Sequence, residues 1–230
     1  MINPKPQNTS REAMLAEIRK HLNQSLPFDA LYQSQHALQR PAKVQIDAAP
    51  NVDLFDRFKQ SLEAVMGNCV RVVSEKHAAE VLQAIIDKLN ARRIAVSDSP
   101  LIHRVLREIK LNGELIENPG KSRLFECDMG ISSAQWAIAE TGTLVIESDS
   151  ERHRLVSLVP PVHVAIFEVE KIVQTMSEVL ASIGQERELS RTITFITGPS
   201  RTSDIELTLA IGVHGPAKLF VIVIDGATNG

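Results

Sequence analysis

The stretch that decides the fold is an apolar run that ends in a glycine–proline turn and continues as a polar segment, Thr194-Phe195-Ile196-Thr197-Gly198-Pro199-Ser200-Arg201-Thr202-Ser203-Asp204-Ile205-Glu206. The apolar residues indicate a strand. Ser203 and Glu206 have the spacing of a capping box, which predicts a helix that begins near Asp204. We expect this helix to end near Gly212. A strand, a tight turn and a helix in this order are typical of an α/β protein.

This turn is also the first candidate for a binding site. The N-terminus of a helix has unpaired N–H donors and a partial positive charge, which attract anions. Arg201 adds a permanently charged guanidinium that suits a carboxylate or a phosphate. We therefore expect a small anion to bind through a run of five residues, Ser200, Arg201, Thr202, Ser203 and Asp204. The other interpretation is a capped helix with an arginine on its surface.

Outward from this stretch, predicted helices and strands alternate. Apolar residues at helical spacing predict helices over 54–66, 78–89 and 169–183 and a short helix that starts at Ser99–Pro100. Apolar runs predict strands over 69–73, 94–96, 162–167, 193–196 and 219–224. The middle of the chain instead indicates short strands at 125–129, 136–139 and 143–146, with a small-residue turn at 130–134. The pattern predicts an α/β fold with a mostly parallel sheet, helices on both faces and a mixed edge.

The first 50 residues are expected to form an extension of this domain. Thr9 and Glu12 have capping-box spacing, and apolar residues recur on one face as far as Leu22, which predicts an amphipathic helix. Residues 23–50 have no sustained period and contain three prolines, which indicates a long connector. We therefore divide the chain into a helix and connector at 1–50 and an α/β domain at 51–230.

Composition and charge argue against several classes of protein. The 230 residues have a formal net charge of −3, whereas dedicated nucleic-acid binders usually have a strong basic balance. No window has the roughly 18 consecutive apolar residues of a membrane span, and the N-terminus lacks the apolar run of a signal peptide. We expect a cytoplasmic protein. Two cysteines, Cys69 and Cys127, are too few for an iron–sulfur cluster, and no histidine spacing indicates a metal site, so no metal or cofactor is expected.

A second candidate site is the segment Ala139-Glu140-Thr141-Gly142-Thr143-Leu144. Glu140 stands between apolar strand residues, where burial perturbs the pKa of a carboxyl group. Gly142 suggests a close approach of the backbone to a ligand, and Thr141 and Thr143 add hydroxyl groups. Such a carboxylate could act as a base, a nucleophile or a ligand anchor. The other interpretation is a glutamate at a strand end that pairs with an arginine or with the start of a helix.

Three further side chains stand at positions where chemistry is plausible. Arg154 could close over an anion that is bound elsewhere. His163 follows the rigid pair Pro160-Pro161 at a strand start, and it can face either the core or a site. His214 lies on a short loop and is a candidate for proton transfer near neutral pH. A nucleophilic triad with Ser200 is not favoured, because the sequence around this serine lacks the GxSxG pattern.

Four motifs, in this order and at this spacing, resemble those of the lactate-utilisation protein C family, the LUD domain: Ala139-Glu140-Thr141-Gly142-Thr143-Leu144-Val145, Arg154–Leu158 with Pro160–Val164, Thr194–Glu206, and Gly212–Pro216. The resemblance covers roughly residues 52–225. It implies a fold similar to that of ribose-phosphate isomerase, glucosamine-phosphate deaminase and CoA-transferase. It also implies a role in the oxidation of L-lactate to pyruvate alongside two iron–sulfur proteins. The family has no agreed catalytic residue, and the chain has Gln135 where the family pattern has an acidic residue.

Three functions are consistent with these residues. The first is an accessory or ligand-binding subunit of a lactate-oxidising system, which binds a small carboxylate or phosphate near Glu140 and His214 and has iron–sulfur subunits as partners. The second is a separate enzyme that resembles a CoA-transferase or a sugar-phosphate isomerase and uses Glu140. The third is a structural adaptor whose N-terminal helix and connector hold partner subunits. The sequence does not decide whether catalysis takes place on this chain.

Overall fold

The computed structural model describes residues 9–24, 53–148, 154–183, 190, 192–203, 209–211 and 215–225. They belong to two parts, which divide after Pro50 and are described separately. In the first part, α1 (Thr9–Gln24) is the expected helix. Its apolar side chains Met14, Leu15 and Ile18 are all exposed.

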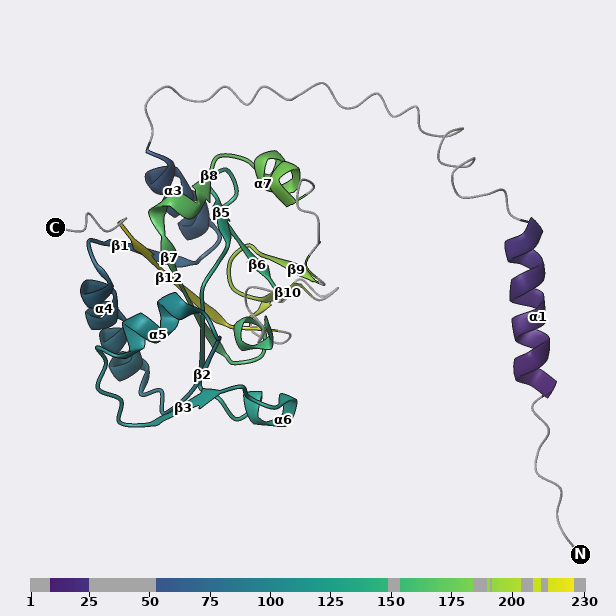
Figure 1. Ribbon diagram of the computed structural model, residues 1–230, viewed down its shortest axis with the longest axis horizontal. Coiled ribbons are helices and arrows are strands. Elements are labelled where there is room, and N and C mark those ends of the chain that lie inside the picture. Colours follow the sequence, from purple (N-terminus) through teal and green to yellow (C-terminus); the bar gives the residue numbers. More distant parts are fainter. Residues whose placement is uncertain are drawn as a thin grey trace, which may run out of the picture. The chain divides into compact units, whose positions relative to one another are not determined.

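The body contains a sheet of six parallel strands in the order β1-β12-β7-β4-β2-β3 (Figure 1). The strands in that order are β1 (Asn68–Val72), β12 (Lys218–Ile224), β7 (Val162–Glu168), β4 (Met129–Ser132), β2 (Arg93–Val96) and β3 (Glu114–Glu117). Helices α4 (Glu75–Leu89) and α5 (Pro100–Leu106) cover one face. The parallel sheet of the α/β prediction is therefore confirmed.

The other face of this sheet is covered by α3 (Leu54–Ala64) and by a second sheet (Figure 1). The second sheet has the order β8 (Ile172–Val173), β5 (Trp136–Ile138), β6 (Thr143–Glu147) and β9 (Ile193–Ile196). Pairing is antiparallel along β5, β6 and β9 and parallel between β5 and β8, and α7 (Met176–Ile183) packs against this sheet. The strands predicted at 136–139 and 143–146 thus form part of a separate layer. The strand predicted at 125–129 is wrong, because residues 125–128 lie in a turn and Met129 begins β4 of the parallel sheet.

Strand β7 illustrates why the central strands are apolar throughout. Val164 and Ile166 face the cluster under α4 and α5, whereas Ala165 and Phe167 face the cluster under α3. Phe167 meets Phe58 of α3 edge to face, with the ring centroids 6.0 Å apart. A parallel strand that is buried on both faces needs apolar residues at every position, which is the pattern that identified these strands.

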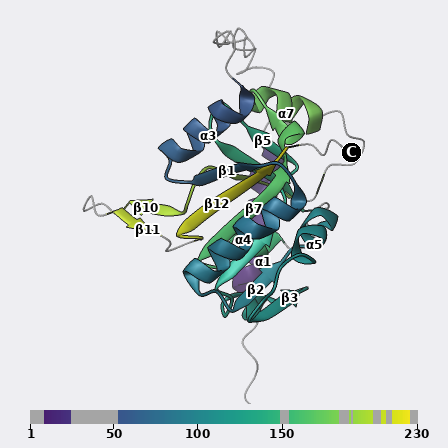
Figure 2. The same ribbon diagram turned by 90° about the vertical axis from the view of Figure 1, so that its left-hand side faces the viewer.

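The helix predicted from near Asp204 to near Gly212 is wrong at its described residues, which form a strand. The described residues of this segment form β10 (Arg201–Ser203) and β11 (Leu209–Ile211), which pair antiparallel and project from the body (Figure 2). Pairing between the two strands gives the backbone of Arg201–Ser203 its partners, so tertiary context overrides the local signal. The anion site predicted at a helix N-terminus therefore has no helix at Ser203, which lies in β10.

Two other boundaries differ from those predicted. The small residues expected to form a turn at 130–134 include most of β4. Gly130 is small because of close packing, since a Cβ there would lie 1.9 Å from the Val156 carbonyl oxygen. The helix predicted over 169–183 is instead the short 3₁₀ turn η2 (Val169–Lys171), then β8, then α7. At the start of α7 the Thr175 hydroxyl accepts a hydrogen bond from the backbone N–H of Glu178 at 3.4 Å and donates one to the Glu178 carboxylate at 3.0 Å, which explains the later helix start.

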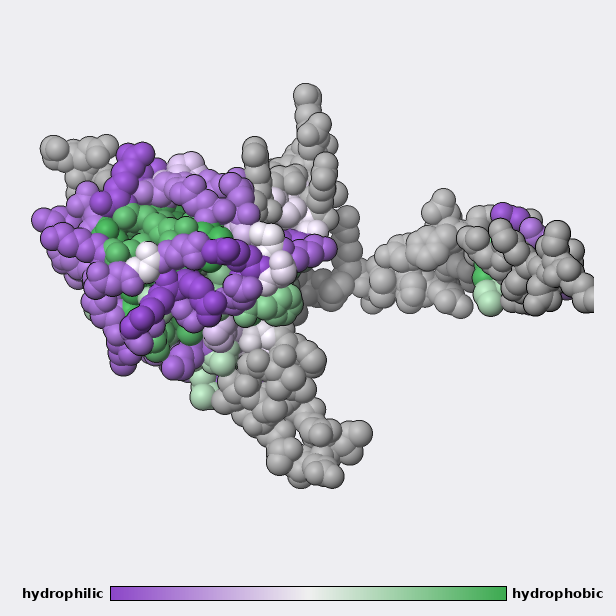
Figure 3. Space-filling view, turned by 90° about the horizontal axis from the view of Figure 1, so that it is seen from below, coloured by the Kyte–Doolittle hydropathy of each residue, from purple (hydrophilic) through white to green (hydrophobic). Residues whose placement is uncertain are grey.

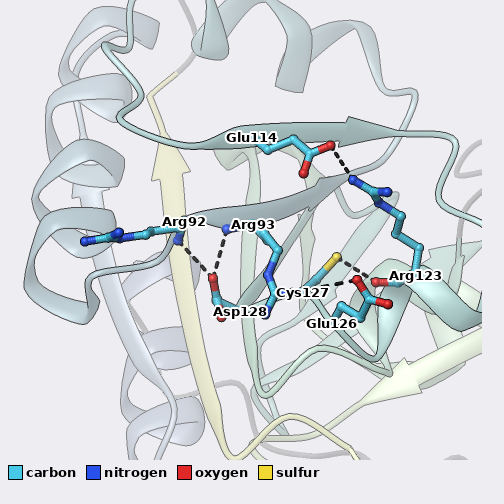
Figure 4. A network of polar contacts seen from close by, with 7 residues as sticks. All are labelled: Arg92, Arg93, Glu114, Arg123, Glu126, Cys127 and Asp128. Atoms are coloured by element: carbon cyan, nitrogen blue, oxygen red, sulfur yellow. Dashed lines mark hydrogen bonds and ion pairs between the residues drawn. The ribbon is translucent and has the colours of Figure 1, made fainter.

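Polar contacts join β2, β3 and the turn before β4 (Figure 4), which lie at the lower end of the body in Figure 1. One carboxylate oxygen of Asp128 accepts hydrogen bonds from the backbone N–H groups of Arg92 and Arg93, at 2.9 and 2.8 Å. Arg123 of α6 (Lys121–Leu124) pairs with Glu114 of β3. Cys127 lies in the same turn, with its thiol 3.3 Å from the Arg123 carbonyl oxygen. These contacts hold the ends of β2, β3 and β4 together.

The surface carries a few exposed apolar side chains. Seen from below, the body has an apolar area that is surrounded by hydrophilic side chains (Figure 3). Phe125, beside α6, is 79% exposed. Within the described ranges, none of the helices combines the length and hydropathy that crossing a bilayer requires.

Candidate functional site

A pocket of about 300 Å³ opens at the amino-terminal ends of β7 and β12. Its other walls come from η1 (Arg154–Ser157), from the end of β9 and from the segment that leads into β10. The lining residues are Ser157, Leu158, His163, Phe195, Ile196, Thr197, Gly198, Pro199, Ser200, Arg201, Gly215, Pro216 and Leu219. The pocket therefore brings together three segments that are distant in the sequence.

The charge of this pocket comes from Arg201. Among the lining residues, which are all described, no aspartate or glutamate is present. One N–H of Arg201 donates to the Val65 carbonyl oxygen at the end of α3, at 2.7 Å. A guanidinium has five N–H donors, so this bond leaves several for an anion. The lining thus favours a negatively charged ligand over a cation.

Hydroxyl groups connect the pocket to the turn between β5 and β6. The hydroxyl oxygens of Thr197 and Thr143 lie 2.7 Å apart, and those of Thr143 and Thr141 also lie 2.7 Å apart. Thr143 is only 1% exposed. The second candidate segment therefore supports the pocket wall through Thr197.

A buried histidine–serine pair lies behind the pocket. His163, at the start of β7, lines the pocket and is wholly buried. Its Nε2 lies 2.9 Å from the hydroxyl oxygen of Ser132 on the neighbouring strand β4. Its Nδ1 is buried and has no hydrogen-bond partner among the described residues. Burial lowers the pKa of His163 to about 3, so the imidazole is neutral at physiological pH.

The structure places the residues of the first candidate site in different surroundings. Ser200 and Arg201 line the pocket, and the backbone N–H of Ser200 donates to the Pro216 carbonyl oxygen at 2.8 Å. Thr202 and Ser203 lie in β10. Asp204 and His214 lie outside the described residues.

The other candidate residues do not line this pocket. Arg154 is exposed in η1, and its carbonyl oxygen accepts a hydrogen bond from the Ser157 hydroxyl. Gly142 has φ of 64° and packs against the backbone of α3, with Thr141 beside it. Glu140 lies in the same turn, and one of its carboxylate oxygens accepts a hydrogen bond from the backbone N–H of Met176 at 2.8 Å. Met176 is the first residue of α7, so the structure gives Glu140 the contact of a helix cap.

We predict that Glu140→Ala lowers the free energy of unfolding by about 0.5–2 kcal/mol, the usual cost of losing a helix cap. Glu140→Gln should cost less, because the amide oxygen can still accept the bond from Met176. Urea unfolding followed by circular dichroism measures both variants. Glu170→Ala, at an exposed glutamate, is the matched control. A Glu140→Ala variant as stable as this control would contradict the capping role.

No metal site is apparent in the described part of the chain, where no cluster of three or more metal-ligating side chains occurs. Both cysteines are free thiols. Burial raises the pKa of Cys69 to about 12 and also raises that of Cys127. Neither thiol is therefore a ready nucleophile at neutral pH.

Sequence reasoning missed the pairing of Ser132 with His163. It considered His163 as a residue that can face the core or a site, and it assigned Ser132 to a turn. The pair forms because β4 and β7 are neighbours and Gly130 is in register with His163. The sequence did contain a sign of β4, because Met129 and Ile131 on either side of Gly130 are apolar. This sign indicates a strand over these residues, but it does not indicate that Ser132 meets His163.

Comparisons with known proteins agree with this architecture. The model of the LUD domain family matches residues 55–224. A lactate utilization protein C from Oceanobacillus iheyensis is 24% identical over 94% of this chain and 98% of its own length. Another with the same name, from Halalkalibacterium halodurans, is 32% identical over 76% of this chain and 87% of its own length. The crystal structure of a DUF162 family protein from Deinococcus radiodurans has the same fold, with a TM-score of 0.53 and 24% identity over 74% of this chain and 96% of that one.

Proposed function

Because this chain belongs to the LUD domain family, we propose that it is the ligand-binding subunit of a cytoplasmic system that oxidises L-lactate to pyruvate. Relatives named lactate utilization protein C, which match most of its length, support a role in lactate utilisation. The oxidation releases two electrons and two protons. Iron–sulfur partner proteins are proposed to accept the electrons, since neither cysteine lies in a cluster of metal-ligating residues among the described residues.

The observation that carries this proposal is the pocket with Arg201 as its charged group. A small carboxylate fits such a lining, because the guanidinium offers paired N–H donors and the neighbouring threonine and serine hydroxyls can donate further bonds. We propose the ligand to lie between Arg201, Ser200 and Thr197. This position differs from the helix N-terminus that the sequence suggested, but it uses the same arginine.

We predict that Arg201→Ala weakens binding of the carboxylate by about 1.5–3 kcal/mol, the usual worth of a hydrogen bond to a charged group. Isothermal titration calorimetry with L-lactate, pyruvate and inorganic phosphate measures the affinity. Arg123→Ala, at an exposed arginine paired with Glu114, is the matched control and should bind as the wild type does. Thermal unfolding of Arg201→Ala is needed as well, because the bond to Val65 also supports α3. A wild type that binds none of these anions contradicts the proposal.

The alternative function is an enzyme of the CoA-transferase or sugar-phosphate isomerase type that uses Glu140. It has less support, because this carboxylate accepts the N–H of Met176 and Glu140 is absent from the pocket lining. Mass spectrometry after incubation with an acyl-CoA tests the first version, since a covalent adduct on Glu140 would favour the enzyme. Turnover of a sugar phosphate would favour the second.

A further inference from the structure

Strand β1 forms one edge of the six-stranded sheet (Figure 1). It pairs with β12 on one side, and no strand among the described residues pairs with it on the other. The backbone N–H of Asp225 donates to the Val72 carbonyl oxygen at 2.8 Å, so Val72 directs its backbone groups toward β12. Successive residues of a strand direct these groups to alternate sides, so the N–H and C=O groups of Cys69 and Arg71 face outward. Such an edge is a template for a further strand.

The two edges of this sheet differ in how their charges are placed. Proteins commonly protect a sheet edge with charged side chains that point into the solvent. Strand β3, at the opposite edge, has Glu114 and Glu117 at its two ends. Strand β1 has a single charged residue, Arg71, and this guanidinium turns back to its own chain and pairs with Asp53 and Asp225. The β1 edge is therefore the less protected of the two.

Exposed apolar side chains follow the β1 edge and match one another across a two-fold axis. Val70, in the middle of the strand, is 36% exposed, Met66 just before the strand is 56% exposed, and Val73 just after it is 72% exposed. In an antiparallel pair of two β1 strands with the axis at Val70, this residue lies opposite its own copy. Val73 then lies opposite Gly67 of the second copy, next to Met66. The edge is therefore complementary to itself.

The backbone groups fit the same register. Cys69 and Arg71, whose groups face outward, lie opposite each other across this axis, and such a pair exchanges two hydrogen bonds. An axis at Arg71 would instead place two like charges opposite each other, which is destabilising. An axis at Cys69 would place Val70 opposite Asn68 and leave the apolar side chains unmatched.

We propose that β1 is the surface through which two copies of this chain associate, as an antiparallel pair of strands centred on Val70. The pairing joins the two six-stranded sheets and covers the apolar side chains of both edges. It also gives the outward backbone groups of Cys69 and Arg71 their partners. The proposal does not depend on the ligand of the pocket, because none of these residues lines it.

Sedimentation equilibrium of the full chain at micromolar concentration tests the association. The wild type should have twice the mass of one chain. Val70→Lys should raise the dissociation constant of the dimer about 10-fold or more, because two lysines would face each other at the axis. Leu115→Lys is the matched control, since Leu115 lies in the opposite edge strand and is also 36% exposed. This variant should remain a dimer.

Two outcomes of this experiment would overturn the proposal. One is a dimer that Val70→Lys weakens no more than Leu115→Lys does. The other is a monomeric wild type, which would leave the β1 edge to a different protein or to another part of the chain.

Disulfide formation tests the register, and it also serves if Val70→Lys does not fold. Val70→Cys would place two thiols in a pair whose Cα atoms lie about 4.5 Å apart, within the range of about 4.4–6.8 Å for disulfides. Mild oxidation should therefore give a covalent dimer linked through position 70, which a non-reducing gel and peptide mass spectrometry detect. Leu115→Cys should stay unlinked. Native Cys69 is an internal control, because its two copies lie diagonally, about 7–8 Å apart, and should not link in the wild type. A link between the two copies of Cys69, or none in Val70→Cys, would overturn the inferred pairing.

Discussion

The Gly142→Ala variant should lose about 2–5 kcal/mol of its free energy of unfolding, from backbone strain of about 1–2 kcal/mol and overpacking of about 1–3 kcal/mol. Gly142 has φ of 64°, a conformation that residues with a Cβ rarely adopt. The added Cβ would lie 2.3 Å from the backbone nitrogen of Leu62 and 2.6 Å from its Cα. Because both are backbone atoms, α3 as a whole must move to relieve the contact.

The same substitution should also weaken ligand binding. The hydroxyl of Ser61 on α3 donates to the Ala139 carbonyl oxygen at 2.9 Å, and the end of α3 accepts the bond from Arg201. A shift of α3 therefore moves the turn between β5 and β6 and also the Val65 carbonyl oxygen that holds Arg201 at the pocket. Denaturant unfolding measures the stability, and calorimetry with L-lactate measures the binding.

Gly120→Ala is the matched control, because no atom lies within 4 Å of a Cβ placed there and its φ is −61°. It should change the free energy of unfolding little. If Gly142→Ala is as stable as Gly120→Ala, α3 does not pack against this turn as described.

Two pairs of residues with the same capping-box spacing, Thr175/Glu178 and Ser203/Glu206, have different outcomes in the structure. Thr175 and Glu178 start α7, whereas Ser203 lies in a strand. Helix α7 has an apolar face, with Val179 and Ile183 buried against Ile138 and Val145 of the second sheet. Strand β10, which ends at Ser203, instead pairs with β11. Capping spacing marks a possible helix start, but the surface that is available for packing decides whether the helix forms.

The parallel sheet was more predictable than the pocket, for a physical reason. A strand buried on both faces is apolar at almost every position, so β2, β7 and β12 are visible in the sequence. The pocket depends on the register between strands. Ser132 and His163 are 31 residues apart and meet because β4 lies beside β7. Arg201 and Thr143 were recognised as polar residues beside glycine turns, whereas their contacts with Val65 and Thr197 require the tertiary structure.

Acidification should destabilise the protein through His163, by about 1.4 kcal/mol for each pH unit below the ordinary histidine pKa of about 6.5. Burial lowers the pKa of His163 to about 3 in the folded chain. Between these values the unfolded chain binds a proton at this ring and the folded chain does not, so the free energy of unfolding falls as the pH falls. The stability associated with the neutral ring is complete above pH ~6.5 and is lost progressively toward pH ~3, with about 2 kcal/mol lost at pH ~5.

The interval from about pH 7.5 to 5 isolates this effect, because carboxylates with ordinary pKa values stay charged there in both states. Asp53, whose pKa the guanidinium of Arg71 lowers, contributes only at lower pH. Urea unfolding at several pH values gives the free energy of unfolding as a function of pH. Its slope should be steeper for the wild type than for His163→Phe, because the phenyl ring cannot be protonated. His77→Gln, at an exposed histidine, should keep the wild-type slope. If His163→Phe does not fold, nuclear magnetic resonance of His163 in the folded wild type measures the pKa of this ring directly. A ring that becomes charged above pH ~5 in the folded protein would contradict the burial of His163.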